Sequence, residues 1–531
     1  MRREFFYSLG VVTVLELLAA FFYPAALWSL IVVIPLAALG LYDAYQKKHT
    51  ILRTFPLLGH GRFLFELVRP EIQQYFIETN IDAHPIEREM RSVVYQRAKG
   101  ELETKPFGTE RDVYRVGYEW AAHSLAPSEK PSPDLYTVVG SSQCEKKCRA
   151  SLLNISAMSY GALSSAAVRA LNEGAAIGGF LHNTGEGGVS PHHLAGGGKL
   201  VWQIGTGYFG CRTPDGQFDA DKFAEKATLD NVAMIEVKLS QGAKPGHGGV
   251  LPGEKVSPEI AQIRGVPVGQ TVISPPRHSA FQTPIEMLEF LQRLRELSGG
   301  KPVGFKICIG REREFLAICK AIRETGIYPD FVTVDGGEGG TGAAPLEFSN
   351  SIGMPARDAW VFARNALVGA GLKDEIKLFV SGKILTGFHV LRALALGADA
   401  CNSARGFMLA LGCIQALRCN TNKCPTGVAT QDPWLVQGLV VEDKRLRVAR
   451  YHEGTLKSLC ELMYAMSVSS PSELDPSMIY RRTSETRVAS YAELYEYLQP
   501  GSLLDQTAPE RWLELWQAAD PRTFGPPAPS A

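Results

Sequence analysis

The stretch Phe331-Val-Thr-Val-Asp335-Gly-Gly-Glu-Gly-Gly-Thr-Gly342 joins a short apolar run to a loop rich in glycine. Apolar and β-branched residues in a run of this length are typical of a strand that is buried on both faces, as in a parallel sheet. Glycine leaves the backbone of the following loop free to turn and to approach a ligand closely. The stretch therefore predicts a buried strand whose carboxyl end carries a binding loop.

The same pattern, a short apolar run followed by a polar or glycine-bearing loop, recurs along the chain. Helical segments such as Glu286–Leu297 and Glu312–Thr325 separate the runs. About eight alternations in roughly 260 residues favour an α/β protein with a closed (β/α)8 barrel, the TIM barrel, over an open doubly wound sheet. Besides Phe331–Val334, the expected strands are Leu152–Ile155, Gly179–His182, Met234–Lys238, Gln270–Ile273, Val303–Ile307, Lys377–Val380 and Ala398–Asn402.

Chemistry in such a barrel gathers where the strands end and the loops begin. Glycines at these ends let a backbone approach a planar or phosphorylated ligand, and their N–H groups can cradle a phosphate. One glycine-rich loop is weak evidence, whereas four in register with strand ends indicate a site. The loops that follow the expected strands, some glycine-rich and some polar, are Ser156–Ser164, Asn183–Gly188, Gln241–Gly249, Ser274–His278, Asp335–Gly342 and Ser381–Lys383.

Three cysteines, Cys413, Cys419 and Cys424, follow each other at spacings of six and five. Thiolates select zinc or iron–sulfur chemistry, and three fall one short of the four expected for structural zinc or a four-iron cluster. The spacing thus favours a three-iron cluster, or a four-ligand site completed from elsewhere. Three buried small hydrophobic residues are the competing interpretation. The other cysteines are scattered, which suits reduced thiols.

Composition restricts the classes of function. The chain has 531 residues, of which 45% are hydrophobic, enough for one large domain with appendages or for two or three domains. Lysine plus arginine number 55 and aspartate plus glutamate also number 55. No net field would recruit nucleic acid, so nucleic-acid binding is not expected.

The segment from Phe5 to Tyr42 is almost entirely apolar, with Glu16 as its one charged side chain. Pro24 divides it, so we expect a transmembrane helical hairpin of Phe5–Phe22 and Ala25–Tyr42. A single span in an uncleaved signal sequence is the alternative. Basic residues flank both ends, which predicts a two-helix multi-pass protein of the inner (cytoplasmic) membrane whose catalytic domain faces the cytoplasm. These residues are Arg2, Arg3, Lys47, Lys48 and Arg53.

Four regions are expected from this pattern. Residues 1–48 form the membrane anchor and residues 49–150 a helical lead-in. Residues 151–470 form the barrel domain, with the cysteine segment 413–424. Residues 471–531 form a C-terminal extension, and its Pro-Pro-Ala-Pro-Ser-Ala end is expected to be disordered.

Several motifs together resemble the FMN-binding synthase domain of glutamate synthase. The resemblance runs from about Leu152 to Gln431, in the order of the family. The matching motifs are Ser159-Tyr-Gly-Ala-Leu-Ser164, Gly185-Glu-Gly-Gly188, Gln241-Gly-Ala-Lys-Pro-Gly246, Leu251-Pro-Gly253, Asp335-Gly-Gly337, Gly339-Gly-Thr-Gly342 and Gly412-Cys413 through Cys424-Pro-Thr-Gly-Val-Ala-Thr-Gln431.

The resemblance implies a barrel that holds FMN beside a 3Fe-4S cluster and reductively aminates 2-oxoglutarate to L-glutamate. It implies Cys413, Cys419 and Cys424 as the cluster ligands. Lys306 would place its charge near the flavin pyrimidine. Its other implied sites are the flavin lining (Met158, Ser159, Gln203), the phosphate site (Gly337, Gly382, Lys383, Ala404, Arg405, Gly406) and the catalytic and 2-oxoglutarate site (Glu186, Lys238, Gln241, Lys244).

Departures from the family shape the expected partners. No glutamine amidotransferase domain fits before Ser151, so ammonia would come from solution or from a separate amidotransferase subunit. A dinucleotide fingerprint is missing, so electrons would come from a ferredoxin, a reductase or a membrane donor. Two alternatives stay open: an N-alkylglutamate-type synthase that uses an amine, and a non-catalytic membrane-tethered electron-transfer subunit.

Overall fold

The computed structural model describes residues 1–127 and 135–525. The expected disorder of the C-terminal end falls on residues 526–531 and lies outside the described part. The chain divides into two compact units, Met1–Arg88 and Glu89–Ala531, and each is described by itself.

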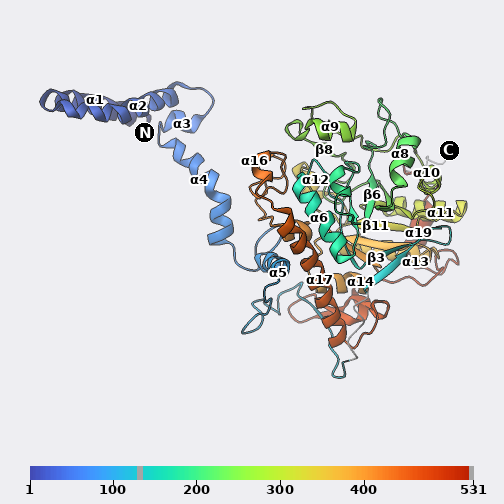
Figure 1. Cartoon of the computed structure of the whole chain (residues 1–531). Coiled ribbons are helices and arrows are strands. Elements are labelled where there is room, and N and C mark those ends of the chain that lie inside the picture. The colour runs from blue at the N-terminus through green and yellow to red at the C-terminus, as the bar shows by residue number, and fades with distance from the viewer. Residues whose placement is uncertain (128–134, 526–531) are drawn as a thin grey trace. The chain divides into compact units, whose positions relative to one another are not determined.

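The second unit contains a closed barrel of eight parallel strands, which confirms the predicted fold (Figure 1). The strands follow one another around the barrel in chain order, and the last pairs with the first. They are β4 (Leu153–Ile155), β5 (His182–Asn183), β6 (Leu200–Ile204), β7 (Val232–Lys238), β10 (Val303–Ile307), β11 (Phe331–Asp335), β12 (Lys377–Ser381) and β13 (Ala400–Ser403).

Amphipathic helices surround the barrel and bury their apolar faces against it. α10 starts with a capping box between Thr283 and Glu286, which satisfies backbone N–H groups at its first turn. α17 packs beside α6, as Figure 1 shows, and a Cβ at Gly174 would meet Val448 at 2.5 Å. The main helices are α6 (Ser165–Gly178), α8 (Ala220–Ala227), α10 (Pro284–Leu297), α11 (Glu312–Thr325), α13 (Ala356–Gly369), α14 (Gly387–Ala395), α15 (Arg405–Leu411) and α17 (Val441–Ala465).

One expected barrel strand was wrong. Residues Gln270–Ile273 do not enter the barrel: β9 (Val272–Ile273) pairs antiparallel with β8 (Val250–Leu251) in the excursion between β7 and β10. The missed strand is β6, whose five residues are all buried between β5 and β7. Both segments are short apolar runs, so only non-local pairing distinguishes them.

Residues 49–150 are less helical than expected. Helices α3 (Thr50–Thr54), α4 (Gly59–Ile72), a π-helical turn (Gln73–Ile77) and α5 (Arg88–Lys99) account for the first half. Strands follow, because β-branched residues such as those of Tyr136–Val139 favour pairing over helix. β2 (Tyr136–Val139) and β3 (Cys148–Ser151) form a hairpin, and β1 (Glu119–Ala121) pairs with β14 (Ile479–Arg482), which pairs with β15 (Val488–Ser490).

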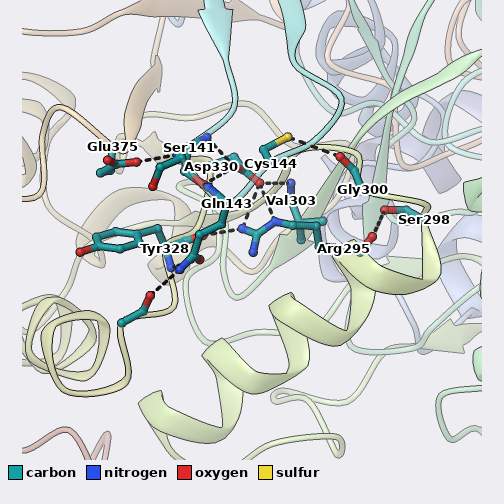
Figure 2. A network of polar contacts seen from close by, with 12 residues as sticks. Ser141, Gln143, Cys144, Arg295, Ser298, Gly300, Val303, Tyr328, Asp330 and Glu375 are labelled. Atoms are coloured by element: carbon teal, nitrogen blue, oxygen red, sulfur yellow. Dashed lines mark hydrogen bonds and ion pairs between the residues drawn. The ribbon is translucent and has the colours of Figure 1, made fainter.

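A buried carboxylate ties the β2–β3 hairpin to the amino end of the barrel. Asp330 precedes β11 and is fully buried, and Figure 2 shows the groups around it. It accepts hydrogen bonds from the backbone N–H and the hydroxyl of Ser141, both at 2.7 Å, and from the Val303 N–H at 2.7 Å. Arg295 of α10 pairs with it at 3.1 Å. This end of the barrel is therefore closed by structural contacts.

The first unit is built on two apolar helices. α1 (Arg2–Phe22) and α2 (Leu30–Tyr45) are separated at Pro24, where a 3-10 turn (Pro24–Ser29) begins, as predicted. Phe6 and Tyr45 pack edge to face between them. By length and composition alone, two segments could cross a membrane: Arg2–Phe22, with mean hydropathy 2.0, and Pro24–Tyr45, with 2.1. A signal sequence can have the same character, so this feature is weak evidence of spans.

Candidate functional site

A cavity opens at the carboxyl ends of the barrel strands. Its volume is about 640 Å³, counting the open space at its mouth. It lies where chemistry gathers in barrels of this class. Among the predicted site residues, the cavity is lined by Ser159, Glu186, Gln203, Lys238, Gln241, Lys306, Gly382, Lys383, Ala404 and Arg405.

Four predicted residues are not part of this lining. Met158 is buried next to Ser159, and the N–H of Gly337 donates to the Met354 carbonyl at 2.8 Å. A Cβ at Gly406 would meet the Tyr451 hydroxyl at 2.4 Å, so Gly406 faces a helix of the barrel wall. Lys244 is buried, and its Nζ donates to the Ala343 carbonyl at 2.9 Å.

One wall of the cavity holds a carboxylate and an ammonium group in contact. Glu186 Oε2 lies 3.1 Å from Lys238 Nζ, and Lys238 also donates to the side-chain oxygen of Gln241. Burial raises the pKa of Glu186, but Lys238, with Arg264 and Lys244 further off, outweighs burial and holds that pKa below its ordinary value. Glu186 is therefore ionised at neutral pH.

The main chain leaves room for this carboxylate. A Cβ at Gly205 would lie 2.7 Å from the Glu186 Cβ, and one at Gly249 would lie 2.1 Å from its Oε1. A side chain at either position would displace the Glu186 side chain from its observed place. The loops that follow β6 and β7 thus shape the space that the Glu186 side chain occupies.

Arg264 is a member of this charge cluster that the sequence did not indicate. It ends α9 (Pro258–Arg264), and its Nη2 donates to the Tyr160 carbonyl at 3.0 Å, while its Nε is buried without a partner among the described residues. Burial lowers its pKa to about 10, and Glu186 opposes that shift. Burial also lowers the pKa of Lys244. Three basic groups thus gather around one carboxylate.

A second ion pair lies beside the first, because Lys306 of β10 is the register partner of Lys238 on the neighbouring strand β7. Lys306 Nζ is 3.3 Å from Asp335 Oδ2. Asp335 also accepts from the Gly242 N–H at 2.9 Å and from the Ser381 hydroxyl at 2.7 Å. Burial lowers the pKa of Lys306, but Asp335 and Glu236 outweigh burial and raise it above its ordinary value. Asp335 received no role from the sequence, although its place at a strand end before two glycines was a signal.

A polar layer inside the barrel supports both pairs. Glu236 is buried and accepts hydrogen bonds from Asn183 at 2.8 Å, Gln203 at 2.7 Å and Thr333 at 2.6 Å. These contacts fix the amide of Gln203, one of the predicted flavin-lining residues. A buried network whose members are all satisfied holds its side chains rigidly.

The opposite side of the cavity is rich in glycine and positive charge. Gly339, Gly340 and Gly382 line it together with Lys383 and Arg405. Arg405 donates to the Glu338 carbonyl at 2.6 Å, which holds its guanidinium beside the glycine loop. Backbone N–H groups, an ammonium and a guanidinium are the donors that a phosphate group takes.

The three cysteines lie in one segment, in which Cys424 is buried and Cys413 and Cys419 are half-buried. Burial raises the pKa of Cys413 to about 11 and also raises that of Cys419. Burial raises the pKa of Cys424 as well, but hydrogen bonds from Thr426 and from backbone N–H groups outweigh it and lower that pKa below its ordinary value. Each thiol acts electrostatically on another.

No three His, Cys, Asp or Glu side chains in residues 1–127 and 135–525 converge closely enough for a single metal ion. A cluster takes each thiolate on a different iron, so it does not require such convergence. One buried and two half-buried thiols that interact electrostatically fit that type of group.

The cysteine segment is attached to the loop that follows β4. Ser164 donates to the Gly427 carbonyl at 2.7 Å, and Gln431 donates to the carbonyls of Gly161 and Leu163. Tyr95 of α5 donates to the Cys413 carbonyl at 2.7 Å. The loop after β4 also carries Met158 and Ser159. The predicted cluster ligands and part of the predicted flavin lining therefore share one scaffold.

Comparison with known proteins agrees with these motifs. The family described as conserved region in glutamate synthase matches residues 96–469. The glutamate synthase large subunit-like protein YerD of Bacillus subtilis is 37% identical over 481 residues, 83% of this chain and 91% of that protein. The archaeal glutamate synthase (NADPH) of Methanocaldococcus jannaschii is 35% identical over 317 residues, 60% of this chain and 59% of that protein.

Among solved structures, a flavocytochrome b2 mutant with benzoylformate covers 88% of this chain and 96% of its own. At 14% identity and a TM-score of 0.44, that likeness is too distant to bear on the chemistry. The family match spans most of the chain, and the Bacillus relative is covered over nearly all of its length. The chain belongs to the glutamate synthase family.

Proposed function

We propose that the protein reductively aminates 2-oxoglutarate to L-glutamate with FMN and a 3Fe-4S cluster. The observation that carries this proposal is the cavity at the strand ends. One wall of the cavity has an ionised carboxylate among basic groups, and the opposite side has groups that can donate hydrogen bonds to a phosphate. Family membership supports the same activity.

Residues of the glycine-rich side would hold FMN. Gly339, Gly340, Gly382, Lys383 and Arg405 would bind its phosphate, and Lys306 would lie at the ring system. Ser159 and Gln203 would line the ring. When bound, FMN supplies the two reducing equivalents of the reaction. The fixed Lys306–Asp335 pair keeps a positive charge where negative charge would build up.

The basic groups on the other wall suit a dicarboxylate. Lys244 and Arg264 do not line the cavity, but both act electrostatically on Glu186, so their positive charge would stabilise a carboxylate of 2-oxoglutarate bound beside it. Ionised Glu186 would take a proton from the incoming ammonium and pass it to the carbonyl oxygen that leaves as water, so that it is ionised again and stabilises the iminium cation. Lys238, which pairs with Glu186 and also donates to Gln241, would hold the carboxylate in place.

The overall reaction balances with one ammonium ion. The carbonyl oxygen leaves as water when the C–N bond forms, and two electrons and two protons then convert the iminium to the amino acid. Electrons would enter through the cluster at Cys413, Cys419 and Cys424 from a ferredoxin or a separate reductase. Ammonia would come from solution or from an amidotransferase subunit.

The apolar hairpin would anchor the enzyme at the cytoplasmic membrane. Two segments have the length and composition to cross a bilayer, and basic residues flank both ends. The catalytic domain would then face the cytoplasm, where 2-oxoglutarate and ammonia occur.

One anaerobic experiment tests the activity. The purified protein is reduced with dithionite and freed of excess reductant. It is then mixed with 2-oxoglutarate and ammonium while flavin absorbance and glutamate are followed. Reoxidation of the flavin with one glutamate formed per two electrons supports the proposal. Reoxidation only with methylamine would indicate an N-alkylglutamate synthase. Calorimetric binding of 2-oxoglutarate without turnover would indicate a non-catalytic subunit.

A further inference from the structure

Lys255 is a buried lysine outside the cavity lining. It ends a short 3-10 turn (Gly253–Lys255) between β8 and α9 and is 2% exposed. Its Nζ donates to the carbonyls of Cys419 and Ala429, both at 2.8 Å, and to the carbonyl of Ala162 at 3.3 Å. One ammonium group thus joins three segments of the chain.

The electrostatic partners of this ammonium are unusual. Its charge interacts with the thiols of Cys419 and Cys424, and no carboxylate of the described residues forms an ion pair with it. A buried ammonium is destabilising unless hydrogen bonds and negative charge offset its desolvation. Three backbone carbonyls supply the hydrogen bonds, and ionised thiolates would supply the negative charge.

We propose that Lys255 positions the cysteine segment for cluster assembly and supplies the positive charge that balances the thiolates of Cys419 and Cys424. The inference rests on the proposed cluster and deepens it. Because Ala162 belongs to the loop after β4, the same ammonium also holds the cysteine segment against the loop that carries Met158 and Ser159. Together with Ser164 and Gln431, Lys255 therefore fixes the cysteine segment relative to this loop.

Two substitutions separate the two roles of Lys255. Lys255→Met keeps the apolar stem but removes the N–H donors as well as the positive charge. Lys255→Gln keeps amide donors without the charge. Lys301→Met is the matched control, because Lys301 is also buried and donates to two carbonyls, Ala227 at 2.6 Å and Leu229 at 2.7 Å, at the other end of the barrel.

The full-length proteins are purified anaerobically, and iron, acid-labile sulfide and flavin are measured per chain. We expect Lys255→Met to lose more than half of its iron and sulfide while retaining flavin, and Lys301→Met to keep all three. Lys255→Gln should keep most of the cluster, with a lower reduction potential, because a positive charge stabilises the more negative reduced state.

The outcomes distinguish this inference from the proposed cofactor. Wild-type protein that holds flavin but no iron or sulfide refutes the cluster and the role of Lys255 with it. If the wild type has a cluster and Lys255→Met has the same iron, sulfide and potential, only the role of Lys255 is refuted. Should Lys255→Met fail to fold, an unchanged potential in Lys255→Gln would refute the charge role by itself.

Discussion

Lys238 sets the ionisation of the carboxylate beside it. Without its ammonium, the largest influence that lowers the pKa of Glu186 is lost, and burial would raise that pKa. We expect Lys238→Met to slow glutamate formation about 100-fold at pH 7 and to recover part of the rate at higher pH, where Glu186 ionises. The measurement is the rate of glutamate formation between pH 6 and 9.

Lys222→Met is the control for this prediction, since Lys222 is an exposed lysine paired with Asp219 at 3.3 Å on α8. It should leave the rate unchanged. A Lys238→Met enzyme with a normal rate and an unaltered pH profile would mean that Glu186 takes no part in proton transfer.

Arg264 illustrates what local sequence patterns cannot indicate. Glu186, Lys238 and Gln241 follow strand ends, so their position near the cavity could be predicted. Arg264 ends a helix in the excursion between β7 and β10, and an arginine at a helix end is common because it interacts favourably with the helix dipole. Only the folded excursion brings it into the electrostatic field of Glu186.

The β2–β3 hairpin is held to the barrel by Asp330. Replacement by Asn keeps the shape of the side chain but leaves Arg295 buried without its counterion. We expect Asp330→Asn to lower the free energy of unfolding by about 3–5 kcal/mol. Urea unfolding followed by circular dichroism in detergent checks this value, with exposed Asp374→Asn as the control. A loss below about 1 kcal/mol would show that the hairpin depends on other contacts.

Four buried histidines and the half-buried His389 should make the entire fold sensitive to acid. Burial lowers the pKa of His182, His389 and His452 to about 3 and that of His278 to about 4, and it also lowers the pKa of His193. Unfolded histidine titrates near 6.5. The folded state therefore keeps its full stability above about pH 6.5 and loses it as the pH falls, because the unfolded chain binds protons first.

Each of these histidines should contribute about 2 kcal/mol of that loss at pH 5. The melting temperature should thus be nearly constant from pH 8 to 7 and fall steeply from pH 6.5 to 5. Ionised carboxylates such as Asp335, whose pKa is lowered, act only below about pH 4 and do not explain a change in this window. A flat melting temperature between pH 7 and 5 would contradict the prediction.

Membrane attachment is the remaining property of the full chain that can be tested. We expect the protein to sediment with membranes and to resist a carbonate wash. The double substitution Val14→Lys with Ile34→Lys places a charge near the middle of each apolar helix, at a cost of about 2.5–3.5 kcal/mol for each lysine. We expect this variant to be released from the membrane. His49→Lys, beyond the hairpin, is the control. Wild-type protein that is released by carbonate would contradict the proposed anchor.

The amino-acid sequence alone was enough to predict the barrel, the strand-end loops that supply much of the cavity lining and the division of the apolar hairpin at Pro24. These features follow from local causes: short apolar runs form strands, polar loops follow their carboxyl ends, and proline interrupts a helix. Tertiary structure decided which apolar run entered the barrel, β6 rather than Gln270–Ile273. It also decided which charges meet, such as Arg264 with Glu186 and Lys255 with the cysteine segment. Strand pairing and burial between distant segments set these contacts, and no local pattern encodes them.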